Sequence, residues 1–205
     1  MKLPQKIDKR KLLLVEGKDE VSFFNVLLEK NKINEIQVMD TGGKEQFKKL
    51  FPIIKNTPGF DELETLAIIH DADKDSQIAF QSVCDVLKNN EIKAPKEESV
   101  FISDTLKVGV FIITYKENKG NLEALCLSSI ESDSIMECID SFTDCIKKKK
   151  NSNYKTPINI HKAKCRAFLS AMEEDTPSLG VATKKEYWNL DSEKLKPLLD
   201  FLKQI

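Results

Sequence analysis

Acidic residues follow three of the apolar runs in this chain. Glu16 comes directly after the run 12–15, Asp40 after a short alternating run, and the sequence DAD (71–73) after the run 66–69. Carboxylates held together repel each other by about 1 kcal/mol per pair at about 4 Å in water, and by about 4 kcal/mol at an effective dielectric of about 20. A hard divalent cation such as Mg²⁺ or Mn²⁺ binds oxygen ligands of this kind and reverses the repulsion. The pattern therefore indicates a metal site, provided that the fold gathers the acids.

The segments that position these acids alternate between two periodicities. Short apolar runs predict five strands, at 12–15, 36–38, 66–69, 99–103 and 108–116. Segments with helical spacing follow several of them, and Asn121 is predicted to be the N-cap of a short helix. Alternating strands and helices predict an α/β fold whose mainly parallel sheet is covered on both faces. The carboxyl ends of parallel strands share one edge, where ligands bind near the point at which strand order reverses.

The helical segments divide the chain into two regions. After DAD, a buried helical face is predicted from five apolar residues, Ile78, Phe80, Val83, Val86 and Leu87. From about residue 130 the pattern is helical throughout, without strand alternation. We therefore predict an α/β unit at 1–128 and a helical extension at 129–205 that packs on the same core.

Composition restricts the partners and the cellular setting. Lys and Arg number 32 and Asp and Glu 33, so the formal net charge is −1 and any site for a polyanion must be local. Five cysteines without a CxxC pair, together with two histidines, support neither a disulfide framework nor a zinc site. No window approaches 18 consecutive apolar residues. We expect a reduced, cytoplasmic protein that does not enter a membrane.

Two of the acidic motifs resemble those of a known domain. VEGKDE (15–20) and IIHDADKDS (68–76) resemble the signatures of the Toprim domain, hydrophobic-Glu-Gly-x-x-Asp and hydrophobic-Asp-x-Asp, over residues 11 to about 115. DTGGK, GNLEALCL and the C-terminal WNLDSEKLKPLLDFL resemble a stand-alone bacterial Toprim-like family related to the nuclease domain of the OLD (overcoming lysogenization defect) proteins. The resemblance implies a three-layer αβα, Rossmann-like fold with a C-terminal helical appendage, and a role in phage defence.

The resemblance also implies roles for four acids. Glu16 would be the catalytic acid or base and a metal ligand, and Asp71 and Asp73 would hold Mg²⁺ or Mn²⁺. Asp19 would complete a second metal position, as in OLD-type nucleases. Each motif alone has a simpler explanation, because an Asp at such a junction often caps the following helix.

Further candidates lie outside the two signatures. Glu123 would be another metal ligand, or else an ordinary acid at a helix N-terminus. In OLD-type sites a lysine beyond the sheet assists charge neutralisation, and the candidates here are Lys162 and Lys164, of which Lys164 is assigned. The simpler alternative for both lysines is a solvated helix face.

Phosphate contacts are predicted next to the acids. Gly42 and Gly43 precede a predicted helix, where backbone N–H groups suit a phosphate, and Lys44 adds charge; the alternative is a plain turn. Lys74 follows DAD where topoisomerases carry an Arg or aromatic residue and could contact phosphate, but the Gly-Glu that follows there is absent here. The motif has no catalytic Tyr context, zinc ribbon or helicase partner domain, which argues against topoisomerase and replicative primase. His70 is interpreted as a residue buried against the sheet rather than as a base.

These observations predict a Mg²⁺-dependent phosphoryl-transfer enzyme, best described as a nuclease acting on DNA or RNA. The alternative is a non-catalytic Toprim-like module that binds metal, nucleotide or a partner protein, which the near-neutral charge favours. Nucleic acid is the expected partner, and a homodimer or a partner ATPase is left open.

Overall fold

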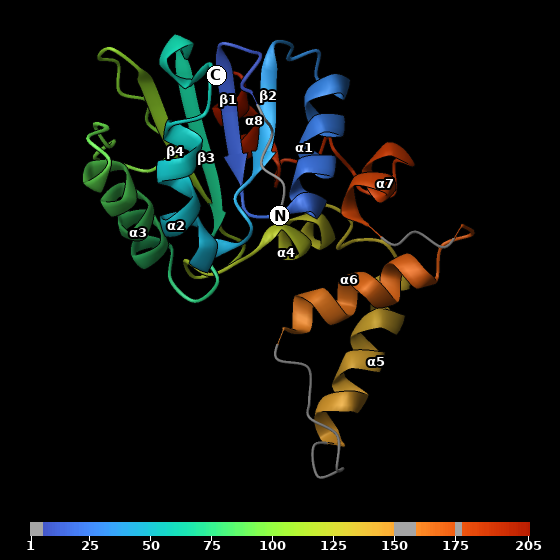
Figure 1. Ribbon diagram of the computed structural model, residues 1–205. Coiled ribbons are helices and arrows are strands. Elements are labelled where there is room, and N and C mark those ends of the chain that lie inside the picture. Colours follow the sequence, from blue (N-terminus) through green and yellow to red (C-terminus); the bar gives the residue numbers. More distant parts are fainter. Residues whose placement is uncertain (1–5, 150–158, 175–177) are drawn as a thin grey trace.

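A computed structural model describes residues 6–149, 159–174 and 178–205 of the chain (Figure 1). Within these ranges the strands are β1 (Lys11–Val15), β2 (Ile36–Asp40), β3 (Thr65–Asp71) and β4 (Lys107–Ile113). The helices of the first 128 residues are α1 (Lys18–Lys30), α2 (Lys44–Lys55), the 3₁₀ turn η1 (Phe60–Glu62), α3 (Ser76–Asn89) and α4 (Leu122–Ser128). Those that follow are α5 (Ile135–Lys148), α6 (Ile160–Ser170), α7 (Leu179–Lys184) and α8 (Lys196–Leu202).

The four strands form one parallel sheet in the order β2-β1-β3-β4. Leu14 of β1 lies opposite Met39 of β2 on one side and opposite Ile68 of β3 on the other. The chain runs outward from β1 to β2 and then returns past β1 to β3, so the strand order reverses between β1 and β3. The predicted α/β, Rossmann-like class is confirmed, and the expected ligand position is the crevice beyond the carboxyl ends of β1 and β3.

Helices cover both faces of the sheet, because alternate residues of each strand point to opposite sides. Leu12 and Leu14 belong to the core formed with α2 and α3, whereas Leu13 and Val15 belong to the core formed with α1 and the helices after β4. These two cores, one on each face, account for the three layers. Of the helices in the described ranges, none is long and apolar enough to span a membrane.

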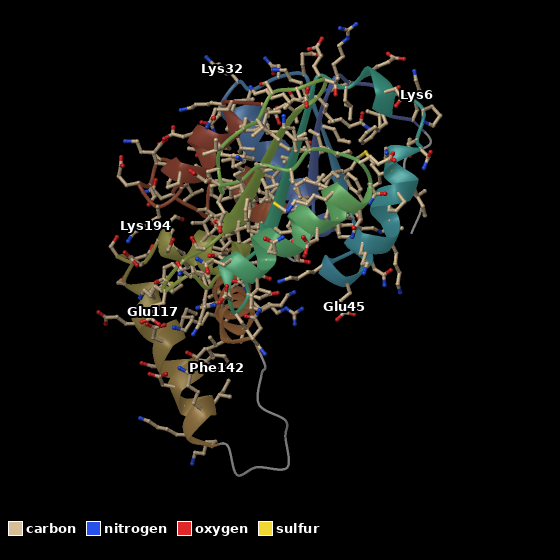
Figure 2. All side chains as sticks on the ribbon, turned by 90° about the vertical axis from the view of Figure 1, so that its left-hand side faces the viewer. Lys6, Lys32, Glu45, Glu117, Phe142 and Lys194 are labelled. Carbon is tan, nitrogen blue, oxygen red and sulfur yellow. The ribbon has the colours of Figure 1, made fainter. Side chains whose placement is uncertain are left out.

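The region after residue 128 takes part in the second of these cores. Trp188 is 2% exposed and its ring packs 5.1 Å from that of Phe168 in α6. Helix α7 contacts α1 so closely that a Cβ on Gly180 would lie 2.2 Å from the Cβ of Ser22. Helices α5 and α6 project beyond the carboxyl ends of the strands (Figure 1), and Figure 2 shows Phe142 on the projecting α5.

The structure differs from the sequence prediction in three elements. The strand predicted at 99–103 is absent from the sheet: Ile102 forms only an isolated antiparallel bridge with Val108. The segment runs along the edge of β4, because the N–H groups of Ser99 and Ile102 donate to the carbonyls of Val110 and Val108. The ring of Phe101 covers Gly109, where a Cβ would come within 2.5 Å of it. Ile78 is 68% exposed, because the buried face of α3 is formed by other residues, among them Ala79, Val83 and Val86. Helix α7 was not predicted as a separate element.

Candidate metal and phosphate site

Glu16 and Asp71 meet across the crevice between β1 and β3. Glu16 is the first residue after β1, and its Oε1 accepts a hydrogen bond from the backbone N–H of Asp71 at 3.0 Å. The carbonyl of Glu16 accepts the N–H of Gly43 at 2.6 Å, which fixes the chain next to β2. The first acidic motif is therefore joined directly to the second at the switch point of the sheet.

Asp71 in turn connects the sheet to α4. Its Oδ1 accepts the backbone N–H of Leu122, the first residue of that helix, at 3.0 Å. Asn121 is the N-cap of α4, as predicted, because its Oδ1 accepts the N–H of Ala124 at 2.9 Å. The second oxygens, Glu16 Oε2 and Asp71 Oδ2, take no part in the bonds that hold these two carboxylates.

The loop after β3 directs Asp73 away from the sheet. Asp73 has a left-handed backbone with φ of 51°, and its N–H donates to the carbonyl of Gly120 at 2.8 Å. Gly120 itself lies against the backbone that follows β4, because a Cβ on Gly120 would lie 2.5 Å from the backbone nitrogen of Tyr115. The N-cap of α3 is Asp75, whose Oδ1 accepts the N–H of Ile78. The alternative in which Asp71 or Asp73 caps this helix is thus wrong.

The acids of the crevice raise the pKa values of one another. Burial raises the pKa of Glu16 to about 7, with further contributions from the charges of Asp73 and Glu20 and an opposing one from the hydrogen bond with Asp71. Burial also raises the pKa of Asp71, and the charges of Glu16, Glu123 and Glu20 add to it. Burial and the neighbouring carboxylates therefore both disfavour the ionised forms of Glu16 and Asp71.

Sequence reasoning missed Glu20, a member of this group. Burial and the charges of Glu123 and Asp19 raise the pKa of the Glu20 carboxyl. Gly17 leaves room for it, since a Cβ there would lie 2.9 Å from Glu20 Oε2. The position could have been found, because Glu20 lies in the first turn of α1, the helix that begins two residues after Glu16 at the carboxyl end of β1.

Asp19 and Asp40 are two further acids that the sequence predicts near this site. Asp19 is exposed in the first turn of α1. Asp40 ends the edge strand β2, and its Oδ1 accepts the N–H of Gly42 at 3.2 Å, so it stabilises the Gly-Gly turn. The grouped acids are those beside β1, β3 and α4, namely Glu16, Glu20, Asp71, Asp73 and Glu123; we refer to them as the acidic group.

Lysines from two elements border the acidic group. Lys44 Nζ lies 3.2 Å from Asp73 Oδ2, and Lys162 Nζ lies 3.5 Å from Glu123 Oε1. Lys164, which the sequence analysis assigned, pairs instead with Asp140 of α5. The two lysines lie at different positions around α6, so Lys162 points toward α4 and Lys164 toward α5. Of the two candidates, the structure brings Lys162 to the acids.

The Gly-Gly turn has fewer N–H groups for a ligand than its sequence suggests. The N–H of Gly42 donates to Asp40, and that of Gly43 donates to the carbonyl of Glu16. Gly43 has a φ of 94° and is the N-cap of α2, without a side-chain cap. Lys44, the first residue of α2, is the part of this turn that faces the acidic group.

His70 lies in the core, as interpreted from the sequence. Its side chain is 2% exposed, and its ring lies 4.8 Å from that of Phe47. Burial, together with the charge of Lys44, lowers the pKa of His70 to about 3, so the imidazole is neutral at physiological pH. His70 Nδ1 is 3.8 Å from Glu16 Oε1, too far for a hydrogen bond.

The chemistry of the acidic group suits a hard divalent cation. Its donors are carboxylate oxygens, and burial, with the charges of neighbouring acids, raises the pKa values of Glu16, Glu20 and Asp71. As the side chains stand, no three acidic, histidine or cysteine residues within the described ranges are grouped closely enough to hold a metal ion. Binding would thus require carboxylates to rotate toward a common point, while the hydrogen bonds of Glu16 and Asp71 keep those two near each other.

Comparisons with solved structures return OLD proteins. The chain is similar to the C-terminal region of the OLD protein of Xanthomonas campestris pv. campestris, with 16% identity over 96% of this chain and 98% of that one and a TM-score of 0.43. It is also similar to the C-terminal region of the Burkholderia pseudomallei OLD protein, with 13% identity over 97% of this chain and 98% of that one and a TM-score of 0.41.

A search of curated proteins finds no match. The sequence model of one protein family, described as "Protein of unknown function (DUF3226)", matches residues 10–205. That range includes every strand, the whole acidic group and the C-terminal helices. The chain therefore belongs to the DUF3226 family.

Proposed function

We propose that this protein is a metal-dependent phosphoryl-transfer enzyme, a nuclease that acts on DNA or RNA. The observation that carries the proposal is the pairing of Glu16 with Asp71 at the switch point of the sheet, where the pKa values of both carboxyls are raised. Perturbed carboxyls in a crevice mark functional sites, because the fold gains nothing from holding like charges together.

Glu16 has the properties of the acid or base in this proposal. With a pKa of about 7 its carboxyl changes protonation near neutral pH, as efficient general catalysis requires. The hydrogen bond from Asp71 orients it. Asp71, Asp73, Glu20 and Glu16 itself would hold Mg²⁺ or Mn²⁺, and such a cation stabilises negative charge on a phosphoryl group.

Other residues would complete the site. Glu123 would be a further ligand, because its charge acts on both Asp71 and Glu20. Asp19 would serve a second cation, as the Toprim resemblance implies. Lys162 would neutralise charge in the role first assigned to Lys164, and Lys44 would contact phosphate beside Asp73.

A second candidate function is a non-catalytic module that binds metal, nucleotide or a partner protein. Two observations favour it: the formal net charge of −1, and the lack of a preassembled three-residue metal site within the described ranges. Against it stands a local concentration of cations, since Lys44, Lys74 and Lys119 all line one cavity next to Asp73. Local basic groups, rather than net charge, provide contacts to phosphate.

A cleavage assay separates the two candidates. Single-stranded and duplex DNA and RNA would be incubated with the protein in Mg²⁺, in Mn²⁺ and in EDTA. We expect cleavage that requires a cation and that falls by about a hundredfold or more in Glu16→Gln, because loss of a general base removes about 10²- to 10⁴-fold in rate. Asp61→Asn is the matched control, since Asp61 is exposed in η1, before β3, at the opposite edge of the sheet. Cation-dependent cleavage that survives Glu16→Gln would disprove the mechanism.

A further inference from the structure

A cavity of about 620 Å³ lies next to the acidic group. The loop after β3, the connection between β4 and α4, and the first turns of α3 and α6 form its walls. Asp73 borders both the cavity and the acidic group. A volume of this size is in the range that binds small organic ligands, about 300–1,000 Å³. A molecule in the cavity would therefore lie directly beside the proposed reaction site.

One side of the cavity is cationic. Lys44, Lys74 and Lys119 contribute to its lining. Lys44 is already paired with Asp73, whereas Lys74 and Lys119 are exposed and form no ion pair with any of the described residues. Two unpaired ammonium groups on the loops that line a cavity suit an anion such as a phosphodiester.

The other side of the cavity is apolar and aromatic. Ile78 lies in the first turn of α3 with 68% of its surface exposed, and Ile160 and His161 begin α6. His161 is half-buried, with its ring edge-on to that of Tyr115 at 5.9 Å. Burial and the charge of Lys164 lower the pKa of His161, which keeps its ring neutral at physiological pH. An exposed isoleucine and a neutral imidazole ring in the lining of one cavity provide a surface for a flat, weakly polar group.

We propose that this cavity holds one unpaired nucleotide of a single-stranded nucleic acid, with its phosphate at Lys74 and Lys119 and its base between Ile78 and the start of α6. The inference rests on the proposed function and specifies its substrate. A base can enter such a cavity only when it is free of its pairing partner, whereas a duplex would contact the lysines alone. Single-stranded DNA or RNA is thus the substrate class, in preference to duplex.

The test measures binding without cleavage. A short fluorescein-labelled single strand of DNA or RNA, and the same sequences as duplexes, would be titrated with the 205-residue chain in EDTA and followed by fluorescence anisotropy. We expect single strands to bind about tenfold or more tightly than duplexes, because stacking of one base contributes a factor of this size. Equal affinity for the two forms, or no binding of either form, would overturn the proposal.

Two variants locate the contact. Ile78→Glu should weaken single-strand binding by about tenfold or more, whereas Ile53→Glu should not, because Ile53 is 53% exposed on α2 away from the cavity. Lys74→Ala and Lys119→Ala should each reduce the slope of log K against log salt by about 0.7. An unchanged affinity in Ile78→Glu would overturn the proposal.

The two proposals fail in different ways. Preferential single-strand binding in EDTA, combined with no cleavage in Mg²⁺ or Mn²⁺, would support the nucleotide cavity and disprove the nuclease activity. Cation-dependent cleavage that is equally fast on duplexes and single strands, and that Ile78→Glu does not affect, would support the nuclease activity and disprove nucleotide binding in the cavity.

Discussion

At the scale of single residues, the chemistry depends on Glu16. Its side chain is 17% exposed, and it accepts one hydrogen bond from Asp71 at the point where strand order reverses. Burial without a cationic partner in direct contact is the cause of its raised pKa. The same feature that suits Glu16 to proton transfer makes its ionised form unfavourable to the fold.

Stability should therefore depend on pH through Glu16. Its pKa rises from 4.5 to about 7 on folding, so between these values the folded chain binds more protons than the unfolded chain. Stability contributed by the protonated carboxyl is present below about pH 4.5 and is lost as pH rises to about 7, by on the order of 3 kcal/mol. Glu16→Gln keeps the hydrogen-bond acceptor and cannot ionise.

Urea unfolding in EDTA at a series of pH values measures this effect. We expect Glu16→Gln to match the wild type near pH 4 and to be more stable above about pH 7. If the free energy of unfolding depended on pH in the same way in both proteins, the pKa of Glu16 would not be raised by folding.

At the scale of elements, the loop from β3 to α3 contains aspartates with two different roles: some belong to the acidic group and one caps a helix. Asp71 and Asp73 belong to the acidic group, while Asp75 caps α3. The same hydrogen bond holds the backbone of Ile78, whose side chain lines the cavity. Three aspartates within five residues thus have different consequences when they are removed.

Substitutions of Asp75 and Asp71 should differ in their effect on the free energy of unfolding. Asp75→Ala should lower the free energy of unfolding by about 0.5–2 kcal/mol through loss of the N-cap. Asp71→Asn should not lower it at neutral pH, because the amide oxygen still accepts the N–H of Leu122 and a like charge is removed. Asp85→Ala, exposed further along α3, is the control and should change stability by less than about 0.5 kcal/mol. Urea unfolding measures all three; a strongly destabilised Asp71→Asn would mean that this carboxylate is structural.

Local patterns identified the strands and most helices, because a buried strand or an amphipathic helix carries its own periodicity. The failures depended on contacts distant in sequence. Residues 99–103 have a strand pattern, yet they pair with β4 only through an isolated bridge at Ile102, and the ring of Phe101 stacks on that of Phe201 at 4.8 Å. The choice between Lys162 and Lys164 depends on how α6 is rotated against α4 and α5, which no local pattern encodes.

At the scale of the whole molecule, the C-terminal region completes the fold around the site. Helix α7 packs on α1, and Trp188 and Phe201 lie in the same core as Leu13 of the sheet. Helix α6, joined to α4 by the pair Lys162–Glu123, places the residues at its start against the cavity. The segment that supplies one wall of the site is thus anchored through the core.

Gly180 tests this anchoring. A methyl group there would lie 2.2 Å from Ser22 Cβ and 2.7 Å from its carbonyl carbon, so α7 must move away from α1. Gly180→Ala should lower the free energy of unfolding by about 1–3 kcal/mol. Val181→Ala is the control on the same helix, since Val181 is 40% exposed, and should have a much smaller effect. Urea denaturation compares the two; equal stabilities would indicate that α7 does not pack on α1 in solution.

A calorimetric titration of Mn²⁺ near pH 7 shows whether the strand-end carboxylates hold a divalent cation. Measured in two buffers of different ionisation enthalpy, binding to the wild type should release protons, because the raised pKa of Glu16 leaves its carboxyl partly protonated. Asp71→Asn should abolish or greatly weaken binding, and Asp61→Asn should preserve it. A wild-type protein that binds no Mn²⁺, or an Asp71→Asn variant that binds it as tightly, would contradict the account.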